Sequence, residues 1–342
     1  MNIVINNDED ISVGSSRVHA HNLVQYLNEI DGVNAALNDW DNYSKYDVAI
    51  FGKNTSFSQL SHARRIHPTL LIGDTNPSNS KEKIKKSKFA DFLITGSIEE
   101  KDFYLDYKKP IVMFPQIEDF KGVSPKHHID KQTNEAINIG YHGNKRHIQG
   151  LSRNLIESLE VLGSERKVTL SLLYDVQTLG RAKLSIKNVE IKHIQWRLDH
   201  FAKEILKFDI GISPGLTSVP RWLKFLYRYF PTSTGHISDY VLRYKNTANA
   251  GRAFVFHQLG IPVVADMTPA HFNMLADGRC GYLAHSKEGW YNALKELSDS
   301  AHIRNLIAQN ATARFDELYD TKIWAETLVK DLNQLLIKKC SH

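Results

Sequence analysis

The chain has few cysteines and no long apolar run. Its two cysteines, Cys280 and Cys340, form no disulfide framework and no zinc-binding spacing. No segment approaches the roughly 18 unbroken apolar residues of a membrane-spanning helix. The start of the chain, Met-Asn-Ile-Val-Ile-Asn, has neither the basic region nor the long apolar stretch of a secretory signal. We therefore expect a cytoplasmic protein.

Several motifs that would define a cofactor are also missing. The sequence has no Walker A pattern, no Gly-x-Gly-x-x-Gly and no His-Glu-x-x-His. We therefore expect no metal and no cofactor, and a nicotinamide or flavin dinucleotide in particular is not expected. Positive charge is in small excess, because 43 Lys and Arg against 38 Asp and Glu leave +5. This excess allows an anionic substrate or an acidic membrane face but is too weak to argue for nucleic acid.

What the sequence does have is a steady alternation of short apolar runs and amphipathic stretches, which is typical of βαβ units. The length of 342 residues exceeds the ~250–300 residues at which single cores stop growing. The predicted fold is therefore α/β with two Rossmann-like doubly wound domains, residues 1–125 and 126–320, and a helical end at 321–342. In the first half we expect strands at Ile3–Asn6, Val33–Leu37, Asp47–Phe51, Thr69–Ile72, Phe92–Thr95 and Ile111–Phe114, and helices at Ser16–Glu29, Ser56–Ile66, Lys81–Ala90 and Ile98–Tyr107.

The pattern stops at residues 119–135, which we predict to be a linker, and then restarts. Residues 214–244 interrupt it again as an insertion. In the second half we expect strands at Ala136–Tyr141, Val168–Tyr174, Val189–Ile194, Asp209–Ser213, Pro262–Ala265 and Gly281–Ala284, and helices up to Leu162 and at Leu198–Phe208, Glu288–Ser298 and Ile303–Leu336, the last broken near Tyr319–Thr321.

The loops that follow strands are the places to look for a ligand, because ligands of doubly wound sheets bind outside the carboxyl ends of the strands. After the first strand comes a small-residue loop that we expect to bind substrate through Gly14, Ser15 and Ser16, with Arg17 as counter-charge and His19 beside them. The alternative is that Ser15 or Ser16 only caps the helix.

A second loop of this kind follows the strand at residues 136–141. Gly143 lies at its turn, and Lys145 and Arg146 then open a helix, where cations are unfavourable for the helix dipole. A pair placed there against this cost suggests an anionic ligand, although an ordinary solvated turn remains the alternative. His142 either faces the ligand or fills the turn.

The third loop lies at residues 243–252, with small residues and cations before an apolar helix that ends at Gly260. Backbone N–H groups at such a helix start can hold a phosphate. We expect this loop to bind an anionic ligand through Lys245, Asn246, Thr247, Ala248, Asn249, Ala250, Gly251 and Arg252.

The sequence has two other basic stretches, of which the first is open to two interpretations. One could rest on anionic lipid or receive an acceptor, or could pack into the core with its cations reaching solvent: Arg221, Trp222, Lys224, Phe225, Leu226, Arg228, Tyr229 and Phe230. The other, Lys81–Lys88, is interpreted as a solvated helix face without a role in a site.

These residues resemble a known family. The basic Gly loop near residue 143, Asp209-Ile-Gly-Ile-Ser-Pro-Gly-Leu216, the small-residue helix start and Gly260-Ile-Pro-Val-Val-Ala265 are similar to GT-B glycosyltransferases of the family-4 type. The resemblance is best over residues 136–320, and reaches the first domain mainly through Gly14–Arg17. It implies two domains facing a cleft and a last helix that crosses back to the first domain.

The resemblance also implies a function. A nucleotide-sugar donor would bind the second domain, including His142, Gly143, Ser213 and Pro214, and a saccharide or lipid-linked acceptor would bind the first. Lys145 or Arg146 would neutralise the donor diphosphate, while the backbone at Ala248–Gly251 cradles it. Transfer would need no metal, and the context would be surface polysaccharide synthesis, in the cytoplasm or at the inner face of the membrane. Asp74, after its strand, is the candidate base in the first domain.

One departure from the family is clear. Retaining members carry two glutamates at positions that correspond here to Thr247 and Val255. Their loss favours one alternative, a non-catalytic subunit that binds nucleotide or glycan. A second alternative is a nucleotide-sugar epimerase, which would need no separate acceptor. The sequence does not define the sugar, the base, the acceptor, the stereochemical outcome or the oligomeric state.

Overall fold

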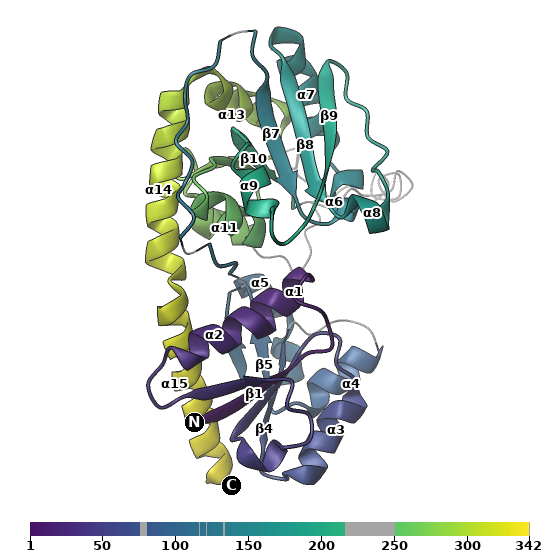
Figure 1. Ribbon diagram of the computed structural model, residues 1–342, viewed down its shortest axis with the longest axis vertical. Helices are drawn as coiled ribbons and strands as arrows, with labels where there is room; N and C mark the ends of the chain where they lie inside the picture. The colour runs from purple at the N-terminus through teal and green to yellow at the C-terminus, as the bar shows by residue number, and fades with distance from the viewer. Residues whose placement is uncertain (76–80, 116, 121, 133, 216–249, 342) are drawn as a thin grey trace, which may run out of the picture. The chain divides into compact units, whose positions relative to one another are not determined.

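The computed structural model describes residues 1–75, 81–115, 117–120, 122–132, 134–215 and 250–341. The chain divides into two compact units. The first unit consists of Met1–Asp119 and Asp316–His342, and the second of Phe120–Phe315. The fold class is as expected: each unit contains a six-stranded parallel sheet covered by helices (Figure 1).

The sheet of the first unit has the strand order β2-β1-β3-β4-β5-β6. All neighbouring strands are parallel, and each expected strand is present. The strands are β1 (Asn2–Asn6), β2 (Asn34–Leu37), β3 (Val48–Phe51), β4 (Leu71–Thr75), β5 (Phe92–Thr95) and β6 (Ile111–Met113). The helical elements are α1 (Gly14–Ser16), η1 (Arg17–His21), α2 (Asn22–Asn28), η2 (Tyr43–Lys45), α3 (Phe57–Ile66), α4 (Lys81–Phe89), α5 (Ile98–Phe103), η3 (Leu105–Tyr107) and α15 (Thr321–Cys340).

Helices cover both faces of this sheet because successive strand side chains point to opposite sides. Ile3 and Ile5 of β1 face α2 and α15, and Leu328 and Leu332 of α15 complete this core. Val4 faces the other way, towards α3. The last helix thus packs on the first unit, as expected, and lies beside α2 in Figure 1.

The basic run at Lys81–Lys88 is not wholly a solvated face, so this interpretation was wrong in part. Lys86 is 1% exposed, and its Nζ lies 2.8 Å from Oδ1 of the buried Asp74. The same Nζ donates to the carbonyl of Gly52 at 2.8 Å. A buried charge needs such partners, and Lys86 therefore ties α4 to the ends of β3 and β4.

The sheet of the second unit has the order β12-β11-β10-β7-β8-β9, again all parallel. Its strands, all expected, are β7 (Ile137–His142), β8 (Val168–Tyr174), β9 (Val189–Gln195), β10 (Ile210–Ser213), β11 (Val263–Asp266) and β12 (Tyr282–Ala284). Its helices are α6 (Lys145–Gln149), α7 (Arg153–Glu165), α8 (Val176–Leu179), α9 (Phe201–Ile205), α11 (Gly251–Gln258), α12 (Pro269–Leu275), α13 (Lys287–Asp299) and α14 (Ala301–Tyr319), of which α14 runs on into the first unit. The expected helix at Leu198–Phe208 is shorter than predicted, while the break before Thr321 is where the sequence placed it.

Two glycines bring the helices of one face close to the second sheet. A Cβ on Gly140 would lie 1.8 Å from the ring of Phe208, and one on Gly211 would lie 2.7 Å from the ring of Phe256. The opposite face is covered by α7 and α13. The α11 helix is thereby held against the strands whose carboxyl ends carry the candidate site.

The two units divide between Asp119 and Phe120, within the segment predicted as a linker, and the rest of that segment is docked on the second unit. The Lys126 N–H donates to the carbonyl of Leu259 at 2.9 Å, and His128 Nε2 donates to that of Gly260 at 2.8 Å. Lys126 and Lys131 both pair with the buried Asp209. Residues 125–131, which we call the strap, have no periodicity because they form an extended segment. Ion pairs and main-chain hydrogen bonds hold this segment in place.

Gly260 is in contact with the strap, and replacing this glycine should lower the stability of the second unit. Its φ is +69°, and a Cβ there would lie 2.9 Å from the Lys126 nitrogen and 2.9 Å from Pro125 Cβ. We expect Gly260→Ala to lower the free energy of unfolding of the second unit by about 2–4 kcal/mol, from backbone strain and overpacking together.

Gly278→Ala is the matched control, because Gly278 has a φ of +73° and nothing within 4 Å of the added Cβ. It should cost only the backbone strain, about 1–2 kcal/mol. Urea denaturation followed by circular dichroism measures both variants. Equal losses would show that the strap does not press on residue 260.

The expected insertion cannot be compared in full. Pro214 and Gly215 are described, but residues 216–249 lie outside the described part of the chain. The basic aromatic stretch at 221–230 lies there too.

Candidate functional site

The strand order of the second unit reverses at one point of its sheet. From β7 the chain moves outward to β8 and β9, and then returns to place β10 on the other side of β7. The carboxyl ends of β7 and β10 therefore border the crevice where doubly wound sheets bind ligands. His142 and Gly143 stand at the end of β7, and Ser213 and Pro214 at the end of β10, so four of the residues predicted to bind the donor meet at this point.

Arg252, in the first turn of α11, extends a cation to the same place. Its guanidinium lies over the ring of Tyr141, with Cζ 5.6 Å from the ring centroid. Nη1 donates to the Tyr141 hydroxyl at 3.2 Å, and Nη2 donates to the carbonyl of Pro214 at 3.0 Å. A guanidinium has five N–H donors, so these two bonds fix its position and leave N–H groups for an anion.

Gly143 leaves room for this arrangement. Its φ of +129° suits only glycine, and a Cβ would lie 3.0 Å from the Tyr141 hydroxyl and 3.4 Å from Arg252 Cδ. The neighbouring His142 is buried and directs Nε2 at the carbonyl of Arg252, 3.2 Å away. Burial lowers the pKa of His142 to about 4. Of the two interpretations of His142, the structure favours the filling of the turn by a neutral imidazole.

Lys145 and Arg146 begin α6, which has only five residues. Asn144 caps this helix by accepting from the Arg146 N–H at 2.9 Å. Lys145 Nζ donates to the carbonyl of Leu179, whereas the Arg146 side chain is exposed. Lys145 therefore joins the start of α6 to the end of α8, and Arg146 is the more accessible cation of the two.

A buried group of polar residues supports the end of β10, and sequence reasoning missed most of it. Ser213 hydrogen-bonds to His271 of α12, and the Gly215 N–H donates to Asp266 Oδ2 at 2.8 Å. Ser213 was among the residues predicted to bind the donor, through the resemblance, and it also lies in the spacing Gly211-x-Ser213-x-Gly215. His271 and Asp266 carried no such signal, because only the fold brings them to the serine.

The third predicted loop is described only in part. Lys245, Asn246, Thr247, Ala248 and Asn249 lie outside the described residues. Ala250 is the N-cap of α11, where it offers no side-chain hydrogen bond, and Gly251 opens the helix. The predicted role of this helix start in binding an anion remains a prediction.

The predicted acceptor loop of the first unit satisfies its own polar groups. The helix begins at Gly14 with Val13 as N-cap, so neither Ser15 nor Ser16 caps it. Ser15 and Ser16 instead bond to Glu9. The helix then passes through a π-helical turn, η1, which carries Arg17 and His19.

Arg17 is not a free counter-charge. Its Nε donates to Glu118 Oε2 at 2.8 Å, Nη2 donates to the other carboxylate oxygen, and Nη1 donates to the carbonyl of Ile11 at 3.0 Å. His19 is buried, and burial lowers its pKa to about 4. The structure thus gives Arg17 and His19 roles inside the unit.

Asp74 is a weak candidate for a base because its side chain has no exposed surface and pairs with Lys86. The sequence reasoning did not name a second buried carboxylate at this edge of the sheet. Glu100 of α5, 4% exposed, accepts from the Gly96 N–H at 2.7 Å. Burial raises the pKa of Glu100 to about 7, and it follows β5 at the carboxyl edge of the first sheet.

The first unit also contains two Asp-x-Asp triplets, at Asp8–Asp10 and Asp39–Asp41. Their carboxylates make separate local hydrogen bonds. Asp8 accepts from Gln59 at 3.0 Å, Asp10 accepts from the Ser12 N–H at 2.8 Å, and Asp39 accepts from the Tyr46 hydroxyl at 2.8 Å. Among the described residues, no three His, Cys, Asp or Glu side chains gather as a metal site would require.

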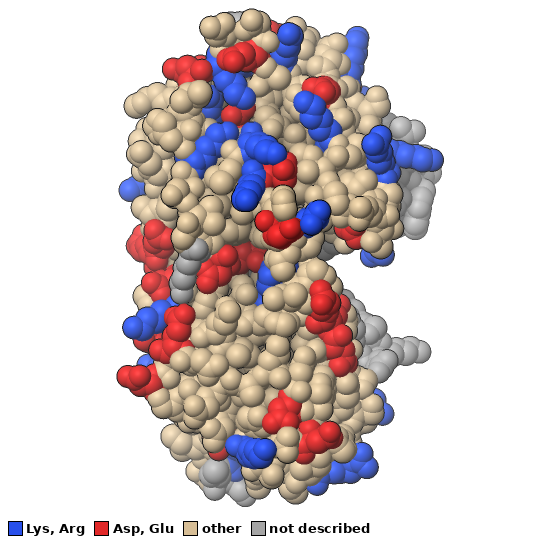
Figure 2. All heavy atoms as spheres, in the orientation of Figure 1, with Lys and Arg blue, Asp and Glu red and all other residues tan. Residues whose placement is uncertain are grey.

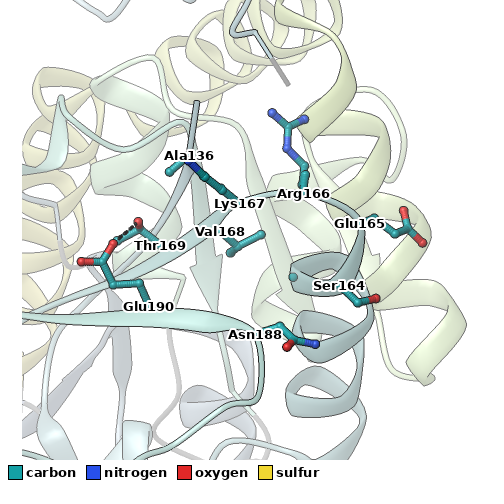
Figure 3. Close-up of a pocket in the computed structure, with 10 residues that line it drawn as sticks. Ala136, Ser164, Glu165, Arg166, Lys167, Val168, Thr169, Asn188 and Glu190 are labelled. Carbon is teal, nitrogen blue, oxygen red and sulfur yellow. Dashed lines mark hydrogen bonds between the residues drawn. The ribbon is translucent and has the colours of Figure 1, made fainter. Parts of the chain in front are cut away.

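A hollow of about 600 Å³ opens at the other edge of the second sheet (Figure 3). It is lined by the turn from α7 into β8, including Arg166 and Lys167, and by Asn188 and Glu190 before and in β9. In Figure 3 the Arg166 guanidinium points away from the other labelled side chains. Since this edge carries the amino ends of the strands, the hollow is separate from the Arg252 site.

The visible surface fits the small net charge. On the face shown in Figure 2, Lys and Arg side chains are interspersed with Asp and Glu. Among the described helices, none is long and apolar enough to cross a membrane.

No protein-family model matches the chain, and no curated protein matches it in sequence. Solved structures do match. HepE from Anabaena, in complex with UDP and glucose, is 13% identical with a TM-score of 0.61, and the match covers 98% of this chain and 100% of HepE. Sucrose-phosphate synthase from Thermosynechococcus elongatus is 11% identical with a TM-score of 0.61, over 99% of this chain and 100% of that one.

A third match is a mutant of S. aureus TarM in complex with fondaparinux, α-GlcNAc-glycerol and UDP. It is 15% identical with a TM-score of 0.56, covering 84% of this chain, which spans 55% of the length of that protein. The chain therefore has the GT-B fold, as the resemblance in its sequence implied.

Proposed function

We propose that the protein is a glycosyltransferase that moves a sugar from a nucleotide-sugar donor to a saccharide or lipid-linked acceptor. The observation that carries the proposal is the position of Arg252: a fixed guanidinium at the point where the strand order of the second unit reverses. A nucleoside diphosphate is an anion suited to such a group. HepE and TarM, which share the fold, are described with UDP bound.

In this proposal the second unit stabilises the leaving group. The diphosphate gains negative charge as the glycosidic bond breaks, and cations and N–H groups already in place lower the energy of that state. Arg252 is the main contributor, with Arg146, Lys145 and the start of α11 beside it. The predicted residues Lys245–Asn249 would complete this site, and the donor is a substrate rather than a cofactor.

The acceptor would bind the first unit at the carboxyl edge of its sheet, where the loop at Gly14–His19 lies. The proposed setting is the cytoplasm or the inner face of the membrane, in surface glycoconjugate synthesis. Contact with a membrane would come from the basic aromatic stretch at 221–230, which lies outside the described residues.

One observation favours a second candidate function, a non-catalytic GT-B subunit that binds nucleotide or glycan. The family that the sequence resembles carries glutamate at two positions. At one of them this chain has Val255, a residue of α11 that is 2% exposed. A buried valine cannot contact a ribose or a sugar, so that contact must come from elsewhere or be absent.

A panel of UDP-, GDP-, CMP- and dTDP-sugars separates these functions. We expect at least one donor to raise the melting temperature and to be turned over with a suitable acceptor, because the site is built for a nucleoside diphosphate. The double variant Lys145→Ala, Arg146→Ala should reduce the thermal shift if these cations bind the diphosphate together with Arg252.

Three results would change the proposal. Binding without turnover would favour the non-catalytic subunit, and turnover of the nucleotide sugar alone would favour an epimerase. No thermal shift with any donor would contradict the diphosphate site. A shift that survives the double variant would exclude only Lys145 and Arg146.

A further inference from the structure

A chain of buried hydrogen bonds joins the carboxyl ends of β10 and β11. His271 Nε2 lies 3.0 Å from Ser213 Oγ, and His271 Nδ1 lies 2.9 Å from the carbonyl oxygen of Asp266. Thr268 Oγ1 also lies 3.0 Å from Nδ1. Each of these four residues is at most 2% exposed, so water does not substitute for any of the bonds.

The direction of these bonds follows from their chemistry. The carbonyl of Asp266 can only accept, so His271 carries its proton on Nδ1 and donates it there. Nε2 must then accept the hydrogen of the Ser213 hydroxyl. The imidazole is therefore neutral, in agreement with burial that lowers the pKa of His271 to about 4.

A serine in a Gly-x-Ser-x-Gly sequence that bonds to a histidine invites comparison with a nucleophile. The surroundings do not fit that role. Ser213 is the last residue of strand β10, is 1% exposed and cannot meet a substrate. The histidine, moreover, is oriented by a main-chain carbonyl rather than by a carboxylate. The pair holds the main chain in place.

The held segment is the turn Ser213–Gly215. Ser213 is bound by His271 at one end, and the Gly215 N–H is bound by Asp266 at the other, at 2.8 Å. Between them, the carbonyl of Pro214 accepts from Arg252 Nη2 at 3.0 Å. The direction of the Arg252 guanidinium thus depends on a carbonyl whose two neighbours are both fixed by buried side chains.

We propose that His271 is a positioning residue, which holds the Ser213–Gly215 turn so that Pro214 aims Arg252 at the diphosphate of the donor. This inference rests on the proposed function, and it adds to the site a residue that never touches the ligand. Side chains that orient a binding group in this way are a recognised part of precise sites.

The test is the dissociation constant of UDP, GDP or dTDP, whichever the wild-type protein binds, measured by calorimetry. His271→Asn keeps a donor near Nδ1 but loses the acceptor at Nε2, and Ser213→Ala removes the hydroxyl that this acceptor binds. We expect each variant to weaken binding about tenfold, and the double variant to be no weaker than either alone, because they break one bond.

A variant in which the cation is already absent separates positioning from general damage. In an Arg252→Ala background, His271→Asn should cause no further loss of binding. His302→Asn is the matched control, since His302 is an exposed histidine of the same unit, and should leave binding unchanged. If His271→Asn does not fold, Ser213→Ala alone carries the same comparison.

The outcomes distinguish the two proposals. If the wild-type protein binds no nucleoside diphosphate, the proposed function fails and this inference fails with it. If Arg252→Ala binds more weakly than the wild-type protein, but His271→Asn and Ser213→Ala bind as tightly as the wild type, only the positioning role is overturned. Additive losses in the Arg252→Ala background would overturn it as well.

Discussion

Replacing Arg252 by alanine is expected to lower kcat/KM for sugar transfer by about two to three orders of magnitude, the range seen when one fixed donor to a developing charge is lost. The guanidinium is held by Tyr141 and Pro214, so the protein contains the cation already in place before the reaction. Water admitted by the smaller side chain would have to reorient as charge develops on the diphosphate. Steady-state kinetics with the donor found by the panel measures the effect.

Two further variants sharpen this result. Arg252→Lys keeps the charge but cannot form the same pair of bonds, and should recover only a small part of the activity. Arg153→Ala is the control, because Arg153 is an exposed arginine of α7 whose ion pair is with Glu157. Activity of Arg252→Ala within threefold of wild type, with an unchanged affinity for the nucleotide, would remove Arg252 from the site.

Mild acid is expected to destabilise the second unit more than the first. Burial lowers the pKa of His142, His128 and His271 from 6.5 to about 4, and that of His257 to about 3. These four lie in the second unit, and among the described residues of the first unit only His19 has a comparable shift.

The sign follows from proton binding. Between about pH 6.5 and pH 4 the unfolded histidines are protonated while the folded ones are not, so the unfolded state binds more protons and stability falls as the pH falls. Each histidine contributes up to about 1.4 kcal/mol per pH unit. For the second unit we expect a loss of about 3–5 kcal/mol between pH 7 and pH 5.5.

Glu100 acts in the opposite direction in the first unit. Its pKa is raised from 4.5 to about 7, so its ionisation weakens the folded state as the pH rises through this range. It therefore offsets His19, and the first unit should change little. Urea denaturation at several pH values, with tryptophan fluorescence and far-ultraviolet circular dichroism, should resolve the two units.

His257 allows the cause to be tested at one position. Neither of its ring nitrogens has a hydrogen-bond partner among the described residues, so His257→Leu removes a titrating group without breaking a bond. The number of protons taken up on unfolding should then fall by about one, and the slope of stability against pH should become smaller in proportion. His302→Leu, an exposed position, should leave the slope as it is. An unchanged slope in His257→Leu would contradict the prediction.

Much of the fold could be predicted because it depends on local patterns. All twelve strands of the two sheets correspond to predicted apolar runs, and the helix break before Thr321 coincides with Asp320, which caps α15. The strap at residues 125–131 could not be predicted. Its bonds go to Leu259, Gly260 and Asp209, which are distant in sequence, and an extended segment has no period that marks it as docked.

The sequence also predicted some residues of the candidate site but not the burial of others. Gly143 stood out because glycine permits turns closed to larger residues, and Arg252 because it lies in a basic, small-residue loop that opens a helix, where backbone N–H groups can hold a phosphate. Burial is what the sequence did not reveal: Arg17, Asp74 and Lys86 look like surface charges, yet each is enclosed and paired. His271 shows the same limit, since its role depends on three elements brought together by the sheet order.

The packing of α15 has a consequence for how the protein is made. Ile3 and Ile5 are synthesised about 320 residues before Leu328 and Leu332, with which they share a core. Residues 120–315, which form the whole second unit, are complete before α15 is synthesised. We therefore expect the second unit to fold during translation, while one apolar face of the first sheet stays only partly covered, by α2, until α15 has been synthesised.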